Sequence, residues 1–313
     1  FKIENLGHCS TELRDSKGTI VKLPKHTVTI EKKLAEGGFA IVFLATDKHN
    51  RHYALKRQFI NDDPRQLEAC QRECRISCLS GHKNIVAYAD HLLTKNSSGV
   101  YEYSLLTAYY KNSVLQLMNE RLSSGRCLSS KEILSIFCDI CEAVARLHHS
   151  QTPVIHRDLK VENVLIDDRR RGVQPFYVLC DFGSATTKVL SAETHSLQYI
   201  EEDINRYTTI SYRAPEMIDL CSCQPIGTKS DIWALGVMLY KLCYFILPFG
   251  ENSLAIQNCS YNFPSQPVYS DELQAIIKCL LDVNIDHRPD IFQTASLAFE
   301  ADGRISPIGN LNV

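Results

Sequence analysis

The chain has 313 residues, of which 44% are hydrophobic and 22% are charged. These proportions are typical of a globular protein with a sizeable core, and they exclude a disordered chain. The 34 basic and 36 acidic side chains nearly balance, and without a basic excess the chain is not expected to bind nucleic acid.

Thirteen cysteines are scattered along the chain at irregular spacings. Their odd number and scatter argue against a secreted disulfide scaffold and favour reduced thiols used as small core residues. The N-terminal sequence lacks the apolar run of a signal peptide, and the longest apolar stretch, 232–240, is too short to span a bilayer. Because the chain starts at Phe1 and not at Met, we expect a domain taken from a longer protein.

The first third of the chain is predicted to form mostly β-strands. Within 26–60, β-branched and aromatic residues alternate around Gly37-Gly38 and around the turn-like segment 47–50.

A helix is predicted to follow over 64–79. Asp63 is a good N-cap, a proline occupies the first helical position, and Gln66 completes a capping box. Helical spacing places three cysteines on one face: Cys70, Cys74 and Cys78. A packed core stripe is the favoured interpretation of this face, and a thiolate metal site is the alternative.

From about Val114 the pattern becomes helical. Ser129 and Glu132 form a second capping box. Apolar residues then recur at a period of 3.6, at Ile133, Leu134, Phe137, Ile140, Cys141, Val144 and Leu147. Loops are predicted over 152–227, and more helices follow to the end of the chain.

The strand-rich and helix-rich parts meet near 105–113, which predicts an α+β protein with a small β-rich lobe and a larger helical lobe. A boundary of this kind is a natural place for a ligand cleft. The predicted divisions are an N-terminal extension at 1–25, an N-lobe at 26–108, a C-lobe at 109–302 and a C-terminal tail at 303–313.

Three short motifs carry the strongest functional signal: HRDLKVEN at 156–163, DFG at 181–183 and APE at 214–216. The pattern His-Arg-Asp-x4-Asn is that of the protein kinase catalytic loop. Any one of these motifs arises easily by chance, but all three occur in order, downstream of a glycine-containing loop and of Ala54-Leu55-Lys56. The chain therefore resembles the eukaryotic protein kinase fold, which has two lobes, over about residues 26–300.

This resemblance implies phosphoryl transfer from ATP with Mg²⁺, a reaction that needs positioning and charge neutralisation more than covalent chemistry. Asp158 matches the carboxylate that orients the substrate hydroxyl and accepts its proton. Asn163 and Asp181 would supply the oxygen ligands that Mg²⁺ prefers. Lys160 would lie near the γ-phosphate, and Lys56 would pair with the α- and β-phosphates.

Lys56 needs an anion to fix its direction. Glu73, on the helix predicted over 64–79, is the favoured candidate because the string QRECRI places it where the kinase pattern has a glutamate. Glu68 is the rival, and a solvated helix carboxylate is the non-functional alternative for Glu73.

The glycine loop is degenerate, since Ala35 and Ala40 stand where the kinase pattern has glycine. Gly37 and Gly38 remain and allow the backbone to approach a phosphate closely. The other nucleotide-pocket residues that the resemblance implies are Leu34, Val42, Ala54, Leu106, Thr107, Tyr109, Leu165 and Cys180. Among them Leu106 aligns with the gatekeeper, and 107–109 with the hinge.

Several matched residues have expected structural roles. Glu216 would pair with Arg288, and Asp231 would hold the backbone of the catalytic loop, because a buried carboxylate needs such partners. Arg157 is a candidate to receive an activation-loop phosphate. The candidate phosphate acceptors include Thr208, Thr209 and Ser211.

The position of Lys160, two residues after Asp158, resembles a Ser/Thr-kinase catalytic loop. Longer strings, among them LAEGGFAIVFLATD, RYTTISYRAPEMIDL and TKSDIWALGVMLYKLCYFILPFGE, closely resemble the Numb-associated kinase family. That family implies phosphorylation of clathrin-adaptor medium subunits, endocytic protein partners and a cytoplasmic location at clathrin-coated membranes, with peripheral membrane association at most. It also implies an extra helix after APE, within 217–228.

Two other functions are weighed against a protein kinase. A pseudokinase that binds nucleotide without transfer is favoured only by the alanines of the glycine loop, and a small-molecule kinase is disfavoured by the intact APE, DIWALG and HRPD strings. The sequence carries no indication of oligomeric state.

Overall fold

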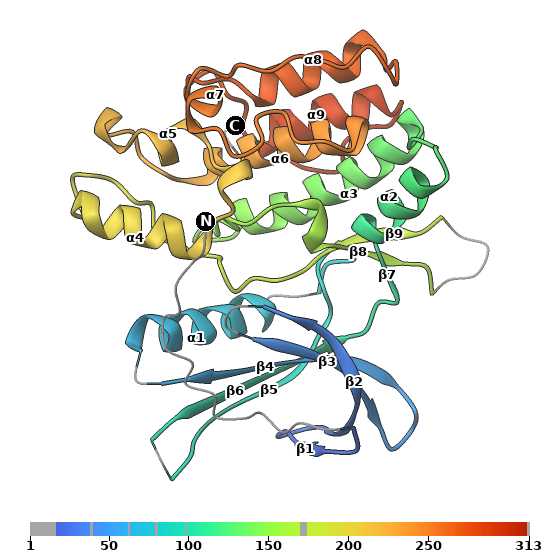
Figure 1. Cartoon of the computed structure of the whole chain (residues 1–313), viewed down its shortest axis with the longest axis vertical. Coiled ribbons are helices and arrows are strands. Elements are labelled where there is room, and N and C mark those ends of the chain that lie inside the picture. Colours follow the sequence, from blue (N-terminus) through green and yellow to red (C-terminus); the bar gives the residue numbers. More distant parts are fainter. Residues whose placement is uncertain are drawn as a thin grey trace. The chain divides into compact units, whose positions relative to one another are not determined.

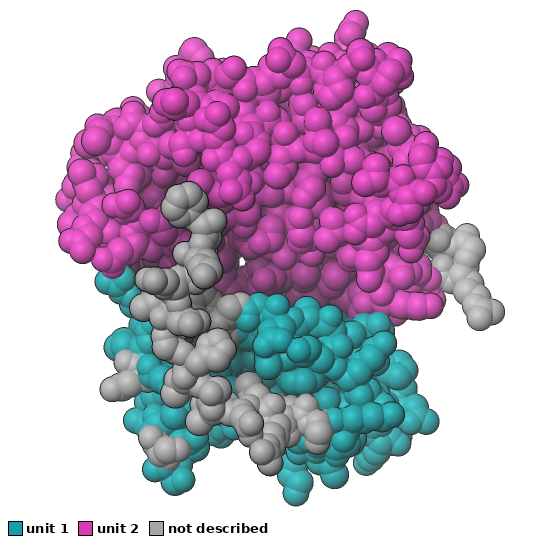
Figure 2. Space-filling model, viewed as in Figure 1, with its two compact units in different colours: residues 1–67, 88–109 teal, residues 68–87, 110–313 magenta. Residues whose placement is uncertain are grey.

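A computed structural model describes residues 17–37, 40–61, 63–78, 81–97, 99–169 and 174–311. The chain forms two compact units, one of residues 1–67 and 88–109 and the other of residues 68–87 and 110–313 (Figure 2). The first unit is built from strands and the second mainly from helices, so the α+β class is confirmed. The predicted limits of the two lobes stay predictions.

The first unit holds one antiparallel sheet of six strands in the order β1-β2-β3-β4-β6-β5 (Figure 1). Its strands are β1 Ile20–Lys22, β2 Thr27–Glu36, β3 Ile41–Asp47, β4 His52–Ile60, β5 Tyr88–Lys95 and β6 Tyr101–Ala108. Alternate side chains of a strand point to opposite faces. One face buries an apolar cluster that includes Ile30, Phe43, Leu55 and Leu106, and this burial fixes the register of the central strands.

The second unit contains most of the helices and a small sheet in the order β7-β8-β9 (Figure 1). Helix α1 Pro64–Cys78 runs into it from the first unit. Its remaining elements are β7 Asn112–Ser113, α2 Val114–Ser123, α3 Ser130–His148, η1 Val161–Asn163, β8 Val164–Asp167, β9 Phe176–Leu179, α4 Leu197–Tyr207, η2 Ile210–Tyr212, α5 Pro215–Ile218, η3 Leu220–Ser222, α6 Thr228–Tyr244, α7 Ser253–Gln257, α8 Asp271–Leu280 and α9 Ile291–Ala301.

The two predicted helix starts are confirmed. The Asp63 carboxylate accepts hydrogen bonds from the backbone N–H groups of Arg65 and Gln66 at 3.0 and 3.2 Å. Ser129 and Glu132 form a reciprocal capping box at the start of α3, which satisfies backbone donors that a helix start leaves unpaired. The apolar stripe predicted along α3 is buried.

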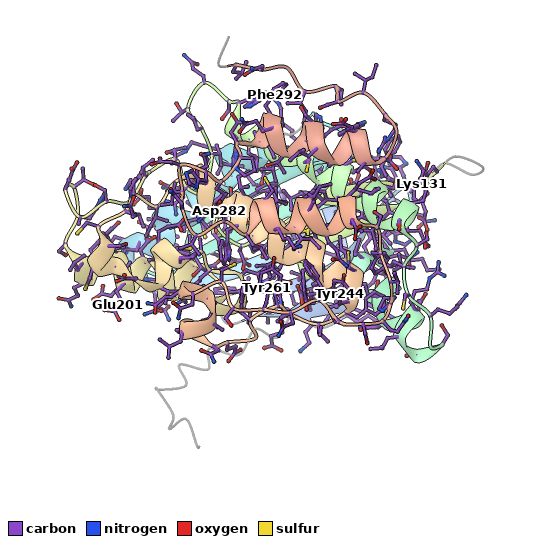
Figure 3. All side chains as sticks on the ribbon, turned by 90° about the horizontal axis from the view of Figure 1, so that it is seen from above. Lys131, Glu201, Tyr244, Tyr261, Asp282 and Phe292 are labelled. Atoms are coloured by element: carbon purple, nitrogen blue, oxygen red, sulfur yellow. The ribbon has the colours of Figure 1, made fainter. Side chains whose placement is uncertain are left out.

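Helices α6 and α8 approach each other at Gly236. A Cβ atom there would lie 2.9 Å from both Leu280 Cβ and Leu281 Cδ2, so only glycine allows this distance. Aromatic rings pack against the same helix, with the ring centroid of Tyr240 5.8 Å from that of Tyr261 and 4.8 Å from that of Tyr244. Figure 3 labels Tyr244 and Tyr261 among the side chains of this unit.

The longest helix of the segment 181–228 lies before APE and not after it. The resemblance implies a helix within 217–228, but the structure has only the short α5 and the 3₁₀ turn η3 near that position. Helix α4 forms instead, because Ser196 caps its start and Ile200 and Ile204 enter an apolar cluster. The prediction of loops over this segment was wrong for 197–207.

All the cysteines that the structure describes are free thiols. Four of them are buried, Cys70, Cys138, Cys141 and Cys243, as expected for core residues, whereas Cys78 is exposed, so the stripe of three on α1 is only partly buried. Among the described residues, none of the helices has both the length and the apolar composition needed to cross a bilayer.

Asp139 lies buried on α3, and its Oδ2 accepts the backbone N–H of Tyr177 on β9 at 2.8 Å. Burial raises the pKa of this carboxyl to about 6, and the Tyr177 hydrogen bond opposes the rise only in part. Since the folded state binds the proton more tightly than the unfolded state, the contribution of Asp139 to stability decreases as pH rises from 3.8 to about 6.

We therefore expect Asp139→Asn to stabilise the protein at pH 8, by roughly 1–3 kcal/mol, because it keeps an acceptor for Tyr177 but carries no charge. Thermal unfolding of both proteins at pH 8 and pH 4 measures the effect, and the difference in midpoint should shrink at pH 4. A difference that is the same at both values would contradict the burial argument.

Candidate active site

The catalytic-loop motif lies in the second unit, between α3 and β8. One Asp158 carboxylate oxygen, Oδ2, is 2.7 Å from Lys160 Nζ, and the other, Oδ1, accepts the Thr209 hydroxyl at 2.7 Å. Lys160 also donates to Thr209 Oγ1 at 3.0 Å. Asn163 Nδ2 donates to the Asp158 carbonyl at 2.8 Å and to the carboxylate oxygen Oδ2 at 3.3 Å. These contacts hold the Asp158 carboxylate in one orientation.

The backbone of this loop is fixed from α6. The buried Asp231 carboxylate accepts the backbone N–H groups of His156 and Arg157 at 2.7 and 2.9 Å, and lies 2.9 Å from His148 Nε2. Burial by itself would raise the pKa of Asp231, but the hydrogen bond and charge of His148 outweigh it, so the pKa is lowered and the carboxylate stays ionised. The predicted role of Asp231 is confirmed.

Arg157 is buried beside Asp158 and adopts a positive φ of 69°. Its guanidinium donates to the Ser184 carbonyl at 2.6 Å, pairs with Asp203 of α4, and stacks 4.8 Å from the Tyr207 ring centroid. Burial lowers the pKa of Arg157, and the Asp203 carboxylate opposes this shift. The anion that meets Arg157 here is thus a carboxylate of the chain itself, which the sequence did not indicate.

Two of the three residues predicted as phosphate acceptors form side-chain hydrogen bonds, and the third is buried. Thr209 lies between Asp158 and Lys160, as described above. Thr208 donates its hydroxyl to the Ile204 carbonyl at 2.6 Å and accepts from Arg213 Nε at 2.8 Å. Ser211 is buried. Sequence reasoning missed the contacts of Thr209 with Asp158 and Lys160.

The other predicted residues of this unit lie close to the loop in sequence and space. Cys180 follows β9, and both its backbone N–H and its Sγ donate to the Asn163 carbonyl, at 3.0 and 3.3 Å. Asp181 is exposed and has a positive φ of 62°. Leu165 lies on β8, in register with Val178 of β9. The two predicted metal ligands thus offer an amide and a carboxylate oxygen, the donor types that suit Mg²⁺.

Lys56 lies on β4 in the first unit, in register with Val42 on one side and Leu105 on the other. Ala54, two residues earlier, is in register with Thr107. Residues directly opposite in paired strands, and residues two apart on one strand, share a face of the sheet. This face therefore carries the predicted Lys56, Ala54 and Val42, together with Thr107.

Leu106 does not share that face. It is in register with Leu55 and lies fully buried in the apolar cluster on the opposite side of the sheet. The prediction of Leu106 as gatekeeper was therefore wrong, because strand alternation turns its side chain away from Lys56. Thr107, one residue later, is in register with Ala54 and lies on the face of Lys56.

Truncation to alanine should have different effects on stability at Leu106 and at Thr107. We expect Leu106→Ala to lower the free energy of unfolding by about 2–5 kcal/mol, because it leaves a cavity in the core. Thr107→Ala should cost less than about 1 kcal/mol but change the affinity of ATP-competitive inhibitors. Denaturant unfolding and inhibitor titration separate the two, and an unchanged stability of Leu106→Ala would contradict the register.

The glycine loop lies between β2 and β3. Gly37 donates its backbone N–H to the Ala40 carbonyl at 2.9 Å, whereas Gly38 lies outside the described residues. Leu34 forms a β-bulge. Lys33 pairs with Phe43 and Ala35 pairs with Val42, and because these two partners are adjacent on β3, no residue of β3 remains opposite Leu34. Tyr109 follows β6, with its ring centroid 6.2 Å from that of His52.

The two candidate glutamates for Lys56 differ in burial on α1. Glu73 is 2% exposed, whereas Glu68 is exposed and forms ion pairs with Arg72 and Lys188 at 3.5 and 3.2 Å. A buried carboxylate must be compensated by a partner, so burial favours Glu73. Its pairing with Lys56 stays a prediction.

The predicted pair of Glu216 and Arg288 is present and buried. Arg288 donates through both terminal nitrogens to the two Glu216 oxygens, at 2.8 and 3.1 Å. This fork joins the start of α5 to the segment before α9, and so holds the chain that follows Thr209.

Comparison with known protein families matches residues 28–299 to the protein kinase domain. The chain belongs to the protein kinase family. The chain is 53% identical over 290 residues to the serine/threonine-protein kinase sel-5 of Caenorhabditis elegans, and 41% identical over 292 residues to the serine/threonine-protein kinase ppk30 of Schizosaccharomyces pombe. A probable serine/threonine-protein kinase of Dictyostelium discoideum is 40% identical over 283 residues.

These matches cover 92%, 91% and 89% of the chain, but only 27%, 30% and 25% of the respective relatives. The chain thus spans between a quarter and a third of the length of the curated relatives that it matches. The protein kinase fold predicted from the motifs is confirmed, and the family in general uses ATP and Mg²⁺ and acts on protein substrates.

Proposed function

We propose that the kinase domain transfers the γ-phosphate of ATP to serine or threonine hydroxyls of proteins. The observation that carries this proposal is the Asp158 carboxylate, oriented by Lys160, Thr209 and Asn163. Related kinases of 40–53% identity are described as serine/threonine-protein kinases or probable ones, which supports the type of acceptor.

In the proposed reaction the acceptor hydroxyl approaches Asp158, which orients it and takes its proton. A bond forms between the hydroxyl oxygen and the γ-phosphorus, and the bond from that phosphorus to the ADP oxygen breaks. Lys160, 2.7 Å from Asp158, is close enough to balance charge on the transferred group. Asn163 and Asp181 would hold Mg²⁺, which would neutralise charge on the phosphates.

We assign Lys56 to the α- and β-phosphates, Ala54 and Val42 to the adenine, and the backbone of 107–109 to its polar edge. Because Lys56 would bind phosphate directly, Lys56→Ala should abolish transfer, and a variant that still turns over ATP normally would show that the site is misplaced.

A pseudokinase is the second candidate, and the alanines at 35 and 40 are the features that favour it. They stand where two glycines of the kinase pattern would let the loop approach phosphate. The oriented Asp158 favours the enzyme, since a module that only binds nucleotide has no need for a positioned carboxylate.

We further propose that the domain belongs to the Numb-associated kinases and phosphorylates clathrin-adaptor medium subunits in endocytic trafficking. This proposal rests on the long strings of sequence that resemble that family. It carries with it a cytoplasmic location at clathrin-coated membranes, which the position of the fluorescently tagged full-length protein relative to clathrin would test.

The decisive experiment is transfer of ³²P from labelled ATP to a purified adaptor medium subunit and, in parallel, to Ser/Thr and Tyr peptide libraries. We expect labelling of the subunit and of Ser/Thr peptides, and none of Tyr peptides. Labelling of the Ser/Thr library alone would keep the kinase and remove the adaptor proposal. No labelling of any substrate would favour the pseudokinase.

A further inference from the structure

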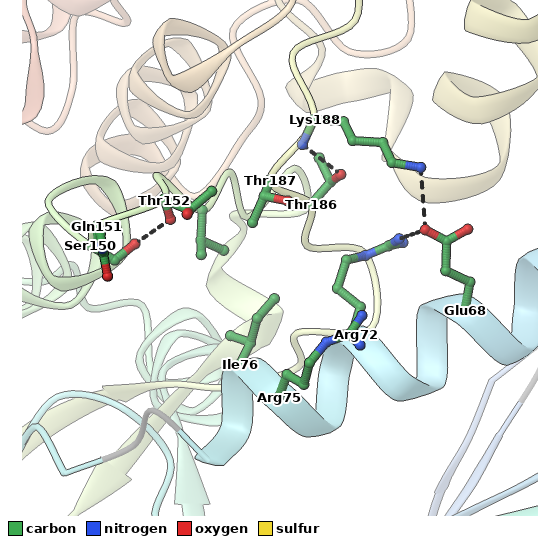
Figure 4. Close-up of a pocket in the computed structure, with 11 residues that line it drawn as sticks. Glu68, Arg72, Arg75, Ile76, Ser150, Gln151, Thr152, Thr186, Thr187 and Lys188 are labelled. Atoms are coloured by element: carbon green, nitrogen blue, oxygen red, sulfur yellow. Dashed lines mark hydrogen bonds and ion pairs between the residues drawn. The ribbon is translucent and has the colours of Figure 1, made fainter.

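A cavity of about 350 Å³ lies in the second unit, lined by residues that do not belong to the catalytic loop. It is lined by one face of α1 and by the segments 150–154 and 186–188 (Figure 4). We call it the α1 pocket. None of the motifs that indicated phosphoryl transfer contributes to its lining.

Basic side chains dominate the lining. Among the described lining residues, Arg72 and Arg75 come from α1 and Lys188 from the segment that follows DFG, against one carboxylate, Glu68. The formal charge of the lining is therefore +3 − 1 = +2. Because it faces a concave space, this charge attracts an anion more strongly than the same groups spread over a convex surface would.

The contacts inside the α1 pocket leave this charge incompletely neutralised. Glu68 Oε1 is shared between Arg72, at 3.5 Å, and Lys188, at 3.2 Å (Figure 4). Arg72 also donates through Nε to the Ala185 carbonyl at 2.5 Å. The Arg75 guanidinium is exposed and makes no hydrogen bond or ion pair with the described residues.

The rest of the lining offers apolar surface for the carbon atoms of a peptide side chain and hydroxyl groups that can form hydrogen bonds with it. Ile76 and Val154 are buried and present apolar surface. Thr152 and Thr187 add hydroxyl groups to the lining. The α1 pocket thus combines two guanidinium groups and an ammonium group with an apolar floor.

We propose that the α1 pocket binds a phosphate monoester carried by a peptide, that is, a phosphoserine or phosphothreonine of a protein partner. A phosphate monoester carries about −1.5 to −2 charges at pH 7, which matches the lining charge of +2, whereas a carboxylate would leave one charge over. Guanidinium groups also bind phosphate oxygens through two parallel hydrogen bonds.

Occupation of the pocket would change contacts close to the DFG motif. A bound phosphate would compete with Glu68 for Arg72 and Lys188. Arg72 holds Ala185, two residues after Gly183, so the phosphopeptide would act on the segment that follows Asp181. Glu68 is therefore an internal competitor, and its removal should strengthen binding.

The test measures fluorescence anisotropy of labelled degenerate peptide libraries that contain a central phosphothreonine, phosphoserine or unmodified threonine. The kinase domain is used without nucleotide or Mg²⁺, so the result does not depend on whether it transfers phosphate. We expect both phosphopeptide libraries to bind, and the unmodified library to bind at least about tenfold more weakly.

Removing basic side chains of the pocket and removing its acidic side chain should change phosphopeptide affinity in opposite directions. Arg75→Ala combined with Lys188→Ala should weaken phosphopeptide binding about tenfold, whereas Glu68→Gln should tighten it several-fold. The matched control is Lys278→Ala, an exposed lysine on α8, which should change nothing. If the double variant unfolds, Arg75→Ala alone and Glu68→Gln carry the test.

Three outcomes would overturn the proposal. Equal binding of phosphorylated and unmodified libraries would show that the phosphate is not recognised. Equal effects of Lys278→Ala and of the pocket variants would place binding elsewhere. Tighter binding of inorganic phosphate, or of phosphatidylcholine vesicles with phosphatidylinositol bisphosphate, would assign the pocket to a small anion or to a membrane.

Discussion

Asp158→Asn is expected to lower the rate of phosphoryl transfer by about 10²–10⁴-fold, the usual contribution of a positioned proton acceptor. The substitution keeps the size of the side chain and an acceptor for Thr209, but it removes the negative charge that lies 2.7 Å from Lys160. The loss should appear in kcat and not in nucleotide affinity, because the assigned contacts to nucleotide lie on other residues.

Single-turnover transfer to a Ser/Thr peptide, with ATP affinity measured by calorimetry, checks this expectation. Thr209 provides a graded control. Thr209→Ser keeps the hydroxyl between Asp158 and Lys160 and should retain most activity, whereas Thr209→Ala should lose part of it. If the Asp158→Asn protein transferred phosphate at the original rate, the proposed role of Asp158 would be wrong.

Arg288→Ala is expected to lower the free energy of unfolding by about 3–5 kcal/mol, because it leaves the buried Glu216 carboxylate without its partner. Arg288 is fully buried, and it also donates to the carbonyls of Lys229 and Asp282 at 2.8 and 3.1 Å. Its guanidinium lies 5.3 Å from the Trp233 ring centroid. The loss in free energy of unfolding therefore includes lost packing and hydrogen bonds as well as the lost ion pair.

Urea unfolding followed by far-ultraviolet circular dichroism measures the effect. Lys33→Ala is the matched control, because the Lys33–Glu36 pair has a similar distance, 2.7 Å, but is largely exposed, and should cost about 0–1 kcal/mol. The double variant Arg288→Met with Glu216→Leu should recover much of the loss, since neither charge is then buried alone. Equal effects of Arg288→Ala and Lys33→Ala would contradict the argument.

Local patterns predicted local structure well. Asp63 and Ser129 marked helix starts because a capping hydrogen bond joins residues only two or three positions apart. The α3 stripe was visible because helical periodicity depends on sequence spacing alone. Helix α4 was missed because its apolar contacts to the cluster are made by few residues, Ile200 and Ile204, within an otherwise polar segment.

The Leu106 error shows where alignment by spacing fails. A shift of one residue along a strand moves a side chain to the other face of the sheet. Only the pairing of β6 with β4, which places Leu106 opposite Leu55, decides which side chain shares a face with Lys56. Two adjacent apolar or small residues in sequence do not reveal this register.

By itself, the sequence determined the α+β class, the kinase family and the residues of the catalytic loop, because motif order, capping and periodicity are properties of neighbouring residues. The tertiary structure decided which distant groups complete the site. Thr209 reaches Asp158 across 51 positions, and Asp231 reaches His156 across 75. Arg157 meets Asp203 across 46 positions, and Arg72, Arg75 and Lys188 meet around one cavity. Such contacts depend on how helices and loops pack, so no local sequence pattern predicts them.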